Sequence, residues 1–218
     1  MSQKKTRLGV EDVSGAWAII PTPAIESGDD WRTEDTVDYI EVARAVAGLI
    51  DAGVDGIMCH GTFGEGASLT WDEKKKMTEV MVETAAGRVP IFAGVTTLNT
   101  RETIKQLKHA RDIGADGTML GLPMWQEMDV PAAVQFYRDV AEAVPEMAIC
   151  IYANPEAFKF TFPTAFWAQV ADIPQVVSCK YINNAQLQLH TMVSRKQIRF
   201  LPLEFDYKDA ARMDPDFH

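Results

Sequence analysis

The sequence predicts an α/β fold of the (β/α)8 barrel (TIM-barrel) type, in which helices cover a parallel sheet. Short apolar runs bounded by Gly, Pro or Asn alternate along the chain with longer amphipathic segments. The short runs are apolar at successive positions, which is typical of parallel strands buried on both faces. No glycine-rich nucleotide-binding motif follows the first run, so the main sequence support for an open doubly wound sheet is missing.

Seven short runs are predicted as strands: Gly15–Ile20, Gly56–His60, Pro90–Val95, Gly117–Leu122, Ala148–Ala153, Val176–Tyr181 and Arg199–Leu203. Six segments between them have apolar residues at helical spacing: Thr36–Ala52, Trp71–Ala86, Arg101–Ile113, Pro131–Val144, Pro163–Val170 and Ala185–Val193. Two of these helices are followed by Gly53 and Gly114, which suit the left-handed position that ends a helix before the next strand.

The strand count falls short of a closed barrel. Such a barrel needs eight strands and typically ~250 residues. The polar stretch 204–218 contains no further strand pattern. We therefore expect a barrel truncated before its eighth strand, with residues 1–14 as an N-terminal extension and residues 15–218 as the barrel domain, incomplete at its C-terminus. A barrel of this kind exposes two strand edges.

Composition narrows the class of partner. Among 218 residues, 31 acidic and 21 basic residues give a formal charge of −10, and no local basic patch offsets it. We expect a small-molecule substrate and neither nucleic acid nor a membrane as partner. The three cysteines lie in apolar runs without a CxxC spacing, which favours buried thiols in a reducing cytoplasm. His60 has no second ligand at a suitable spacing, so no metal site is expected.

Catalytic side chains of a barrel lie at the C-terminal ends of its strands. Lys180 ends the apolar run Val-Val-Ser-Cys-Lys, and Tyr152 ends Ala-Ile-Cys-Ile-Tyr on the preceding strand. Lys180 is either a desolvated amine able to form a Schiff base with a ketone or a surface lysine just beyond the strand. Tyr152 is either a proton shuttle or ordinary packing. A Lys and a Tyr at the ends of neighbouring strands form a stronger signal together than either does alone.

Other residues at the same strand ends suggest a binding site. The glycine-rich turn 60–66 could present backbone N–H groups and the Thr62 hydroxyl to an anion, although a plain turn is the commoner meaning of such spacing. Trp125 and Phe158 either add aromatic surface at this end or belong to the core.

Three motifs in this order resemble a known family. Gly-Thr-Phe-Gly-Glu (61–65), Tyr-Ala-Asn-Pro (152–155) and Ser-Cys-Lys-Tyr (178–181) resemble the dihydrodipicolinate synthase / N-acetylneuraminate lyase superfamily of pyruvate-dependent class I aldolases. The Pro-Met-Trp segment and the extended run that begins Tyr-Ala-Asn-Pro resemble its hydratase-aldolase branch. The resemblance covers about residues 15–209.

The resemblance implies roles for individual residues. Lys180 matches the Schiff-base lysine and Tyr152 the proton-shuttling tyrosine. Thr62 and the Phe63 backbone match the loop that binds the pyruvyl carboxylate. The covalent Schiff base makes a metal or diffusible cofactor unnecessary, and the full-length family member is expected to be a homo-oligomer, a tetramer.

Departures from the synthase pattern point to the substrate. Trp125 and Asn154 resemble positions that shape the aryl end of the pocket in the hydratase-aldolase branch. The synthase has a second Thr where Phe63 stands, a partner-subunit Tyr where Trp125 stands, and an Arg near Ala157. The resemblance therefore implies a carbon–carbon lyase that cleaves o-substituted benzylidenepyruvates to an aromatic aldehyde and pyruvate, in the catabolism of polycyclic aromatic hydrocarbons.

Two alternatives stay open at this point. One is another pyruvate aldolase or dehydratase of the same superfamily that acts on sugar acids. The other is a catalytically silent truncated fragment. The ortho substituent of the substrate, hydroxyl or carboxylate, is also open.

Overall fold

A computed structural model describes residues 7–182, 184–203, 206, 208 and 211–212 of the chain. Within this part, seven parallel strands form one sheet in the order of the sequence. They are β1 (Trp17–Ile19), β2 (Gly56–Met58), β3 (Ile91–Gly94), β4 (Gly117–Leu120), β5 (Ala148–Tyr152), β6 (Val176–Lys180) and β7 (Arg199–Leu201). Every predicted strand is confirmed, and each is shorter than its apolar run.

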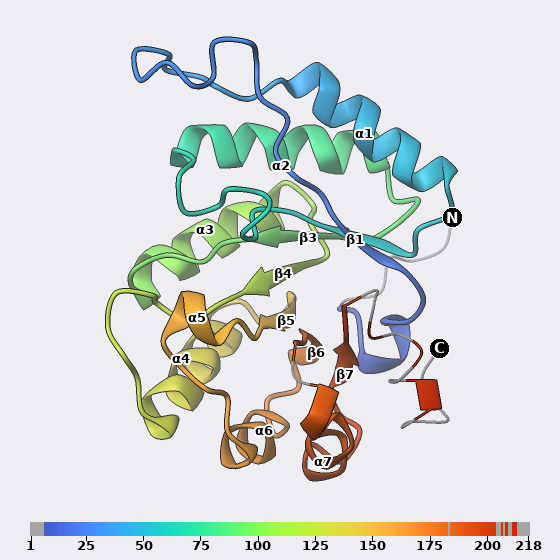
Figure 1. The fold of residues 1–218 in the computed structure, drawn as a ribbon, viewed down its shortest axis with the longest axis vertical. Coiled ribbons are helices and arrows are strands. Elements are labelled where there is room, and N and C mark those ends of the chain that lie inside the picture. The colour runs from blue at the N-terminus through green and yellow to red at the C-terminus, as the bar shows by residue number, and fades with distance from the viewer. Residues whose placement is uncertain (1–6, 183, 204–205, 207, 209–210, 213–218) are drawn as a thin grey trace.

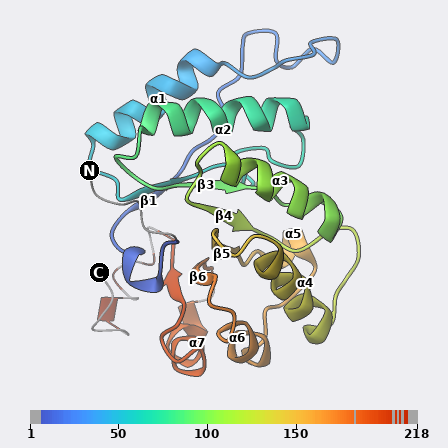
Figure 2. The same cartoon turned by 180° about the vertical axis from the view of Figure 1, so that it is seen from behind.

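Helices lie around the outside of the curled sheet, from α1 past α4 to α7 (Figures 1 and 2). The helices of the described residues are α1 (Tyr39–Asp51), α2 (Trp71–Ala85), α3 (Thr100–Asp112), α4 (Val130–Ala143), α5 (Pro155–Phe158), α6 (Thr164–Val170) and α7 (Leu187–Val193), and the 3-10 turns are η1 (Val10–Asp12) and η2 (Asn184–Gln186). All six predicted helices are confirmed, although the predicted helix Ala185–Val193 begins as the 3-10 turn η2. The helix α5 and the turn η1 were not predicted.

This arrangement confirms the predicted fold class for the described residues. Each strand pairs in parallel with its sequence neighbours, and β1 and β7 are the two edges of the sheet. The predicted strandless stretch 204–218 lies mostly outside the described residues. The boundary between extension and barrel domain at residue 15 stays a prediction, although Val13 already packs in the core.

Residues at the helix ends explain where the main helices begin and where α1 and α3 end. The carboxylate of Asp38 accepts hydrogen bonds from the first turn of α1, and Asn99 and Asp129 do the same for α3 and α4. Gly53 and Gly114 follow α1 and α3 with φ of 87° and 96°, in the left-handed region that a residue with a Cβ avoids. The predicted helix ends at these glycines are confirmed.

A buried carboxylate holds the long segment that follows β1. Glu73, in the first turn of α2, accepts hydrogen bonds from the backbone N–H and the hydroxyl of Thr36, at 2.8 and 2.7 Å. It also accepts from the backbone N–H and the hydroxyl of Thr70, both at 2.8 Å. Burial raises the pKa of Glu73, but these hydrogen bonds outweigh that effect and lower the pKa to about 2.

The ladder between β5 and β6 contains a register shift. Ile149 is paired with Val176, whereas the next residue of β5, Cys150, is paired with Ser178. One extra residue of β6 is accommodated at this point. Beyond the shift the pairing is regular, and it ends with Tyr152 opposite Lys180.

An aromatic cluster fills the space between β6, β7 and their helices. The fully buried Trp167 of α6 packs edge-on against Tyr181 and Phe200, with ring centroids 6.0 and 5.0 Å apart. The Tyr181 hydroxyl lies 2.6 Å from Nδ1 of His190 in α7. This packing holds the segment directly after Lys180 against the body of the domain. Among the described residues, no helix combines the length and hydrophobicity needed to cross a membrane.

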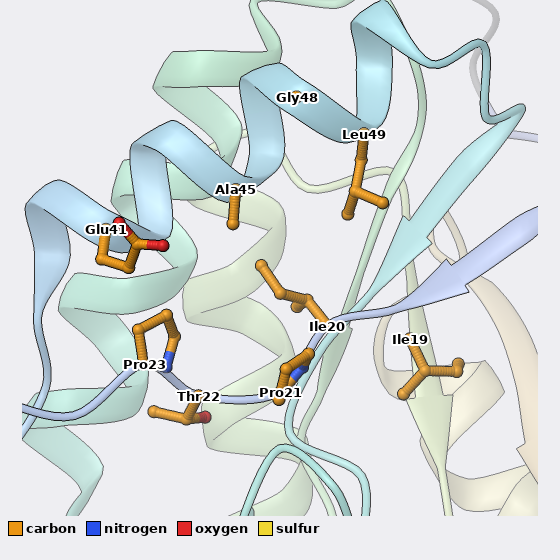
Figure 3. A pocket seen from close by; sticks show the side chains of 9 residues that line it. All are labelled: Ile19, Ile20, Pro21, Thr22, Pro23, Glu41, Ala45, Gly48 and Leu49. Carbon is orange, nitrogen blue, oxygen red and sulfur yellow. The ribbon is translucent and has the colours of Figure 1, made fainter.

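An apolar groove of about 520 Å³ lies between the end of β1 and one face of α1 (Figure 3). The figure shows Ile20 and Pro23 below the helix, with the small residues Ala45 and Gly48 above them. None of the residues predicted for catalysis or substrate binding lines this groove.

Candidate active site

Lys180 and Tyr152 are brought together at the C-terminal ends of β6 and β5. Their Cα atoms are register partners, and the Lys180 Nζ atom lies 4.3 Å from the centroid of the Tyr152 ring. Lys180 is half-buried and belongs to the strand, so the alternative of a lysine beyond the strand end is wrong. The amine and the phenol therefore form one constellation, as the strand pattern predicted.

Two neighbours hold the Tyr152 hydroxyl. The Thr62 Oγ1 atom lies 2.7 Å from it, and the Asn154 side-chain N–H donates to it at 3.3 Å. Burial raises the pKa of Tyr152, but hydrogen bonds to Thr62 and Asn154 and the positive charge of Lys180 outweigh burial, so the net pKa is lowered. A phenol in this environment gives up and takes back its proton more easily than one in an apolar core.

The glycine-rich turn after β2 is tightly folded and places Thr62 at the phenol. The Gly66 N–H donates to the Gly61 carbonyl at 3.1 Å, and the Lys74 amine donates to the Gly66 carbonyl at 2.8 Å. Thr22, which follows β1, donates its hydroxyl to the Gly64 carbonyl at 2.8 Å. The turn is thereby fixed from two sides, with Thr62 directed at Tyr152.

His60, which opens this turn, is buried and uncharged. It has a left-handed backbone with φ of 55°, and its Nδ1 atom lies 3.5 Å from the Cys59 sulfur. Burial and the nearby charge of Lys74 lower the pKa of His60 to about 3, so the imidazole is neutral at pH 7. Among the described residues, no three His, Cys, Asp or Glu side chains are grouped as metal ligands would be.

Two aromatic side chains at this end are exposed. Phe63 is 71% exposed, and its ring centroid lies 5.9 Å from the Lys180 Nζ atom. Trp125 is 72% exposed, so the alternative that placed it in the core is wrong. Its carbonyl accepts a hydrogen bond from the Lys159 amine at 3.1 Å. Trp125 also lines a groove of about 580 Å³ together with Leu98, Asn99, Thr100, Pro123, Gln126 and Met128.

The single-turn helix α5 connects several of these residues. Asn154 caps it by accepting a hydrogen bond from the Ala157 N–H at 3.1 Å, and Pro155 is its first residue. Asn154 followed by Pro155 is a helix-start signal that the sequence displays, although four residues are too few for a periodic pattern. Phe158, at the other end, is buried as its core alternative proposed.

Comparison with known proteins identifies the family of the chain. Residues 29–201 match the dihydrodipicolinate synthetase family. The chain belongs to this family.

Members of the family differ in how similar they are to the chain. It is 60% identical over 210 residues to a trans-O-hydroxybenzylidenepyruvate hydratase-aldolase of Sphingobium xenophagum, covering 96% of the chain and 64% of that protein. It is 39% identical over 171 residues to a trans-2'-carboxybenzalpyruvate hydratase-aldolase of Nocardioides sp. (strain KP7), covering 78% of the chain and 52% of that protein. The chain thus spans less than two thirds of the length of these relatives.

Two solved structures are similar to the chain over nearly its whole length. The structure of PhdJ bound to a substrate intermediate superimposes with a TM-score of 0.94 at 42% identity, covering 98% of the chain and 67% of PhdJ. A dihydrodipicolinate synthase from Acinetobacter baumannii complexed with pyruvate superimposes with a TM-score of 0.82 at 25% identity, covering 92% of the chain and 66% of that chain. The chain therefore shares its fold with both of these proteins.

Proposed function

We propose that the chain carries the Schiff-base site of a pyruvate-dependent hydratase-aldolase that cleaves o-substituted benzylidenepyruvates. The observation that carries the proposal is the contact of the Lys180 amine with the Tyr152 ring, with the phenol hydroxyl held by Thr62 and Asn154. The identity of 60% to a trans-O-hydroxybenzylidenepyruvate hydratase-aldolase supports the reaction class.

In the proposed reaction the Lys180 amine adds to the C2 ketone of the substrate. Loss of water gives an iminium that is conjugated to the C3–C4 double bond. A water molecule then adds at C4, and C3 takes up a proton. We propose that Tyr152 moves the protons of these steps. The hydrogen bonds at its hydroxyl and its lowered pKa support this role.

Carbon–carbon cleavage follows. Removal of the proton from the C4 hydroxyl breaks the C3–C4 bond, the aromatic aldehyde leaves, and the electron pair passes into the enamine on Lys180. Protonation at C3 and hydrolysis of the iminium release pyruvate and restore the amine. Thr62 and the following backbone N–H groups are proposed to hold the carboxylate so that C2 faces Lys180, which is a positioning contribution.

Exposed aromatic side chains support an aromatic substrate over a sugar acid. Phe63 and Trp125 offer apolar surface at the mouth of the site. Polyhydroxylated substrates would need hydrogen-bonding groups at these positions. We propose that Trp125 and Asn154 border the aryl group.

The remaining expectations are also proposals. The lysine Schiff base supplies the electron sink, so we propose that the reaction needs neither metal nor diffusible cofactor. A homotetramer and a cytoplasmic location are proposed for the whole protein. The location is supported by three unpaired, buried cysteines, which are typical of proteins from reducing compartments.

Borohydride trapping tests the proposal. The 218-residue chain is incubated with pyruvate and sodium cyanoborohydride and then digested, and its peptides are weighed. A carboxyethyl adduct is expected on the Lys180 peptide, absent from Lys180→Arg and retained in Lys159→Arg, which changes an exposed lysine at the same end. A folded chain without the adduct would favour a silent fragment.

A turnover screen then separates the substrate classes. Hydroxy- and carboxy-substituted benzylidenepyruvates are compared with 2-keto-3-deoxy sugar acids, with aldehyde release followed by absorbance. Release of an aromatic aldehyde is expected. Turnover of the sugar acids alone would reject the proposed substrate class.

A further inference from the structure

The helix α5 contacts Tyr152 at two separate points. At its start, the Asn154 side chain donates to the Tyr152 hydroxyl. At its end, the buried Phe158 ring packs edge-on against the Tyr152 ring, with centroids 5.3 Å apart and an interplanar angle of 79°. Edge-to-face contacts of this kind have a preferred geometry, so they orient a ring as well as bury it.

The tip of the Phe158 ring lies against the main chain just after β4. A Cβ added at Gly121 would lie 2.0 Å from the Phe158 Cζ atom and 2.3 Å from its Cε1 atom. Gly121 does not have the positive φ that would itself exclude alanine. The Phe158 ring is therefore what requires a glycine here. The Gly121 N–H in turn donates to the Thr96 hydroxyl at 2.9 Å, which fixes the main chain after β4 to the segment after β3.

We propose that Phe158, held against the main chain of Gly121, is a positioning residue that sets the Tyr152 phenol beside the Lys180 amine. The inference rests on the proposed function and deepens it. Phe158 acts on the position of the Lys180 amine relative to the phenol only through its contact with the Tyr152 ring. A shorter side chain at position 158 leaves the Tyr152 ring room to tilt away from Thr62 and Lys180. Displacements of about 1 Å in such constellations can lower rates by about 10²-fold.

The first test compares two buried phenylalanines. Phe158→Leu keeps an apolar side chain but removes the ring that contacts Tyr152. Phe160→Leu is the matched control, because Phe160 is also buried but packs its ring against Phe162 and Phe166. We expect kcat with the benzylidenepyruvate to fall by about 10- to 10²-fold in Phe158→Leu, with little change in KM and with the pyruvate adduct on Lys180 retained. Phe160→Leu is expected to keep the wild-type kcat.

The second test is a double-mutant cycle. Gly121→Ala places a methyl group where the Phe158 ring lies, so kcat is expected to fall as in Phe158→Leu. The double variant is expected to be more active than the product of the two single effects predicts, because leucine vacates the space that the methyl group needs. Multiplicative effects would show that Gly121 and Phe158 act separately and would overturn this part of the proposal.

A readout independent of turnover is the titration of the Tyr152 phenol. Tyrosine labelled with ¹³C at Cζ is followed by NMR, and the Tyr152 signal is assigned with Tyr152→Phe. We expect the phenol to titrate below its ordinary value in the wild type and at a higher pH in Phe158→Leu, with no change in Phe160→Leu. Should Phe158→Leu fail to fold, Gly121→Ala gives the same comparison.

The outcomes are distinguishable. A wild-type chain that forms no pyruvate adduct would reject the proposed function, whereas the phenol titration would still decide the positioning role. Wild-type kcat and an unchanged phenol titration in both Phe158→Leu and Gly121→Ala would overturn the positioning role and leave the proposed function standing.

Discussion

Replacing Glu73 by glutamine should remove a stabilising, pH-dependent contribution to folding. The carboxylate accepts four hydrogen bonds from Thr36 and Thr70, and all four of these groups are donors. The glutamine amide has the same shape but no charge, and one of its two polar groups is an NH₂, which cannot accept hydrogen bonds from these donors. The substitution therefore weakens the attachment of the segment after β1 to the start of α2.

The size of the effect follows from the pKa. The pKa of Glu73 falls from an ordinary value of 4.5 to about 2 in the folded state. Because the pKa of Glu73 is lower in the folded state than in the unfolded state, its charged form stabilises the fold fully at pH values above the unfolded-state pKa. This stabilisation is lost as the pH falls from about 4.5 towards about 2. The charged form is worth about 3 kcal/mol at pH 7, and more than half of that should be lost by about pH 3.

Urea unfolding followed by circular dichroism measures this contribution. We expect wild-type chain to exceed Glu73→Gln by about 3 kcal/mol in free energy of unfolding at pH 7, and the gap to narrow steadily below about pH 4.5. Glu79→Gln, which changes a carboxylate at the surface of the same helix, should show a far smaller gap. A gap of constant size from pH 7 to pH 3 would refute the reasoning.

Three further predictions concern the site and the core. Thr62→Val removes the hydrogen bond between Thr62 and the Tyr152 hydroxyl. It should lower kcat by about 10- to 10²-fold and raise the pH at which the phenol titrates. An unchanged pH–rate profile would contradict this prediction. The three cysteines are fully buried, and burial raises the pKa of the Cys59 thiol to about 11. Ellman's reagent at pH 8 should therefore label no cysteine in the native chain and three in guanidinium. A thiol that reacts rapidly in the native chain would be inconsistent with this packing. Gly94→Ala puts a methyl group 2.5 Å from the Cys59 carbonyl oxygen and should destabilise the chain by about 1–3 kcal/mol in chemical denaturation, whereas Gly48→Ala, where a Cβ meets nothing within 4 Å, should not.

The strand pattern was sufficient to predict much of the fold and the proximity of Lys180 and Tyr152. Apolar runs on both faces fixed the parallel sheet, and alternation placed Lys180 and Tyr152 at the same end of neighbouring strands. Gly53 and Gly114 marked helix ends because the left-handed backbone there depends on a single local residue.

Contacts between distant parts of the chain could not be predicted in this way. Thr62 and Tyr152 are separated by 90 residues, so only the assembled fold shows that their hydroxyls meet. The contacts of Phe158 with Tyr152 and Gly121 depend on how closely the Phe158 ring approaches the main chain after β4. Local patterns indicate which face a side chain occupies, whereas such contacts depend on tertiary packing.

The register shift between β5 and β6 allows the two ends of this strand pair to meet different structural requirements. In an unshifted ladder that began with the same Ile149–Val176 pair, Tyr152 would stand opposite Cys179, and Lys180 would be one rung further on. Side chains of adjacent rungs project to opposite sides of a sheet. The residue pairs at the start of the two strands can therefore keep the register that hydrophobic packing favours. The extra residue of β6 places the Lys180 amine opposite the Tyr152 phenol at the C-terminal ends of the strands.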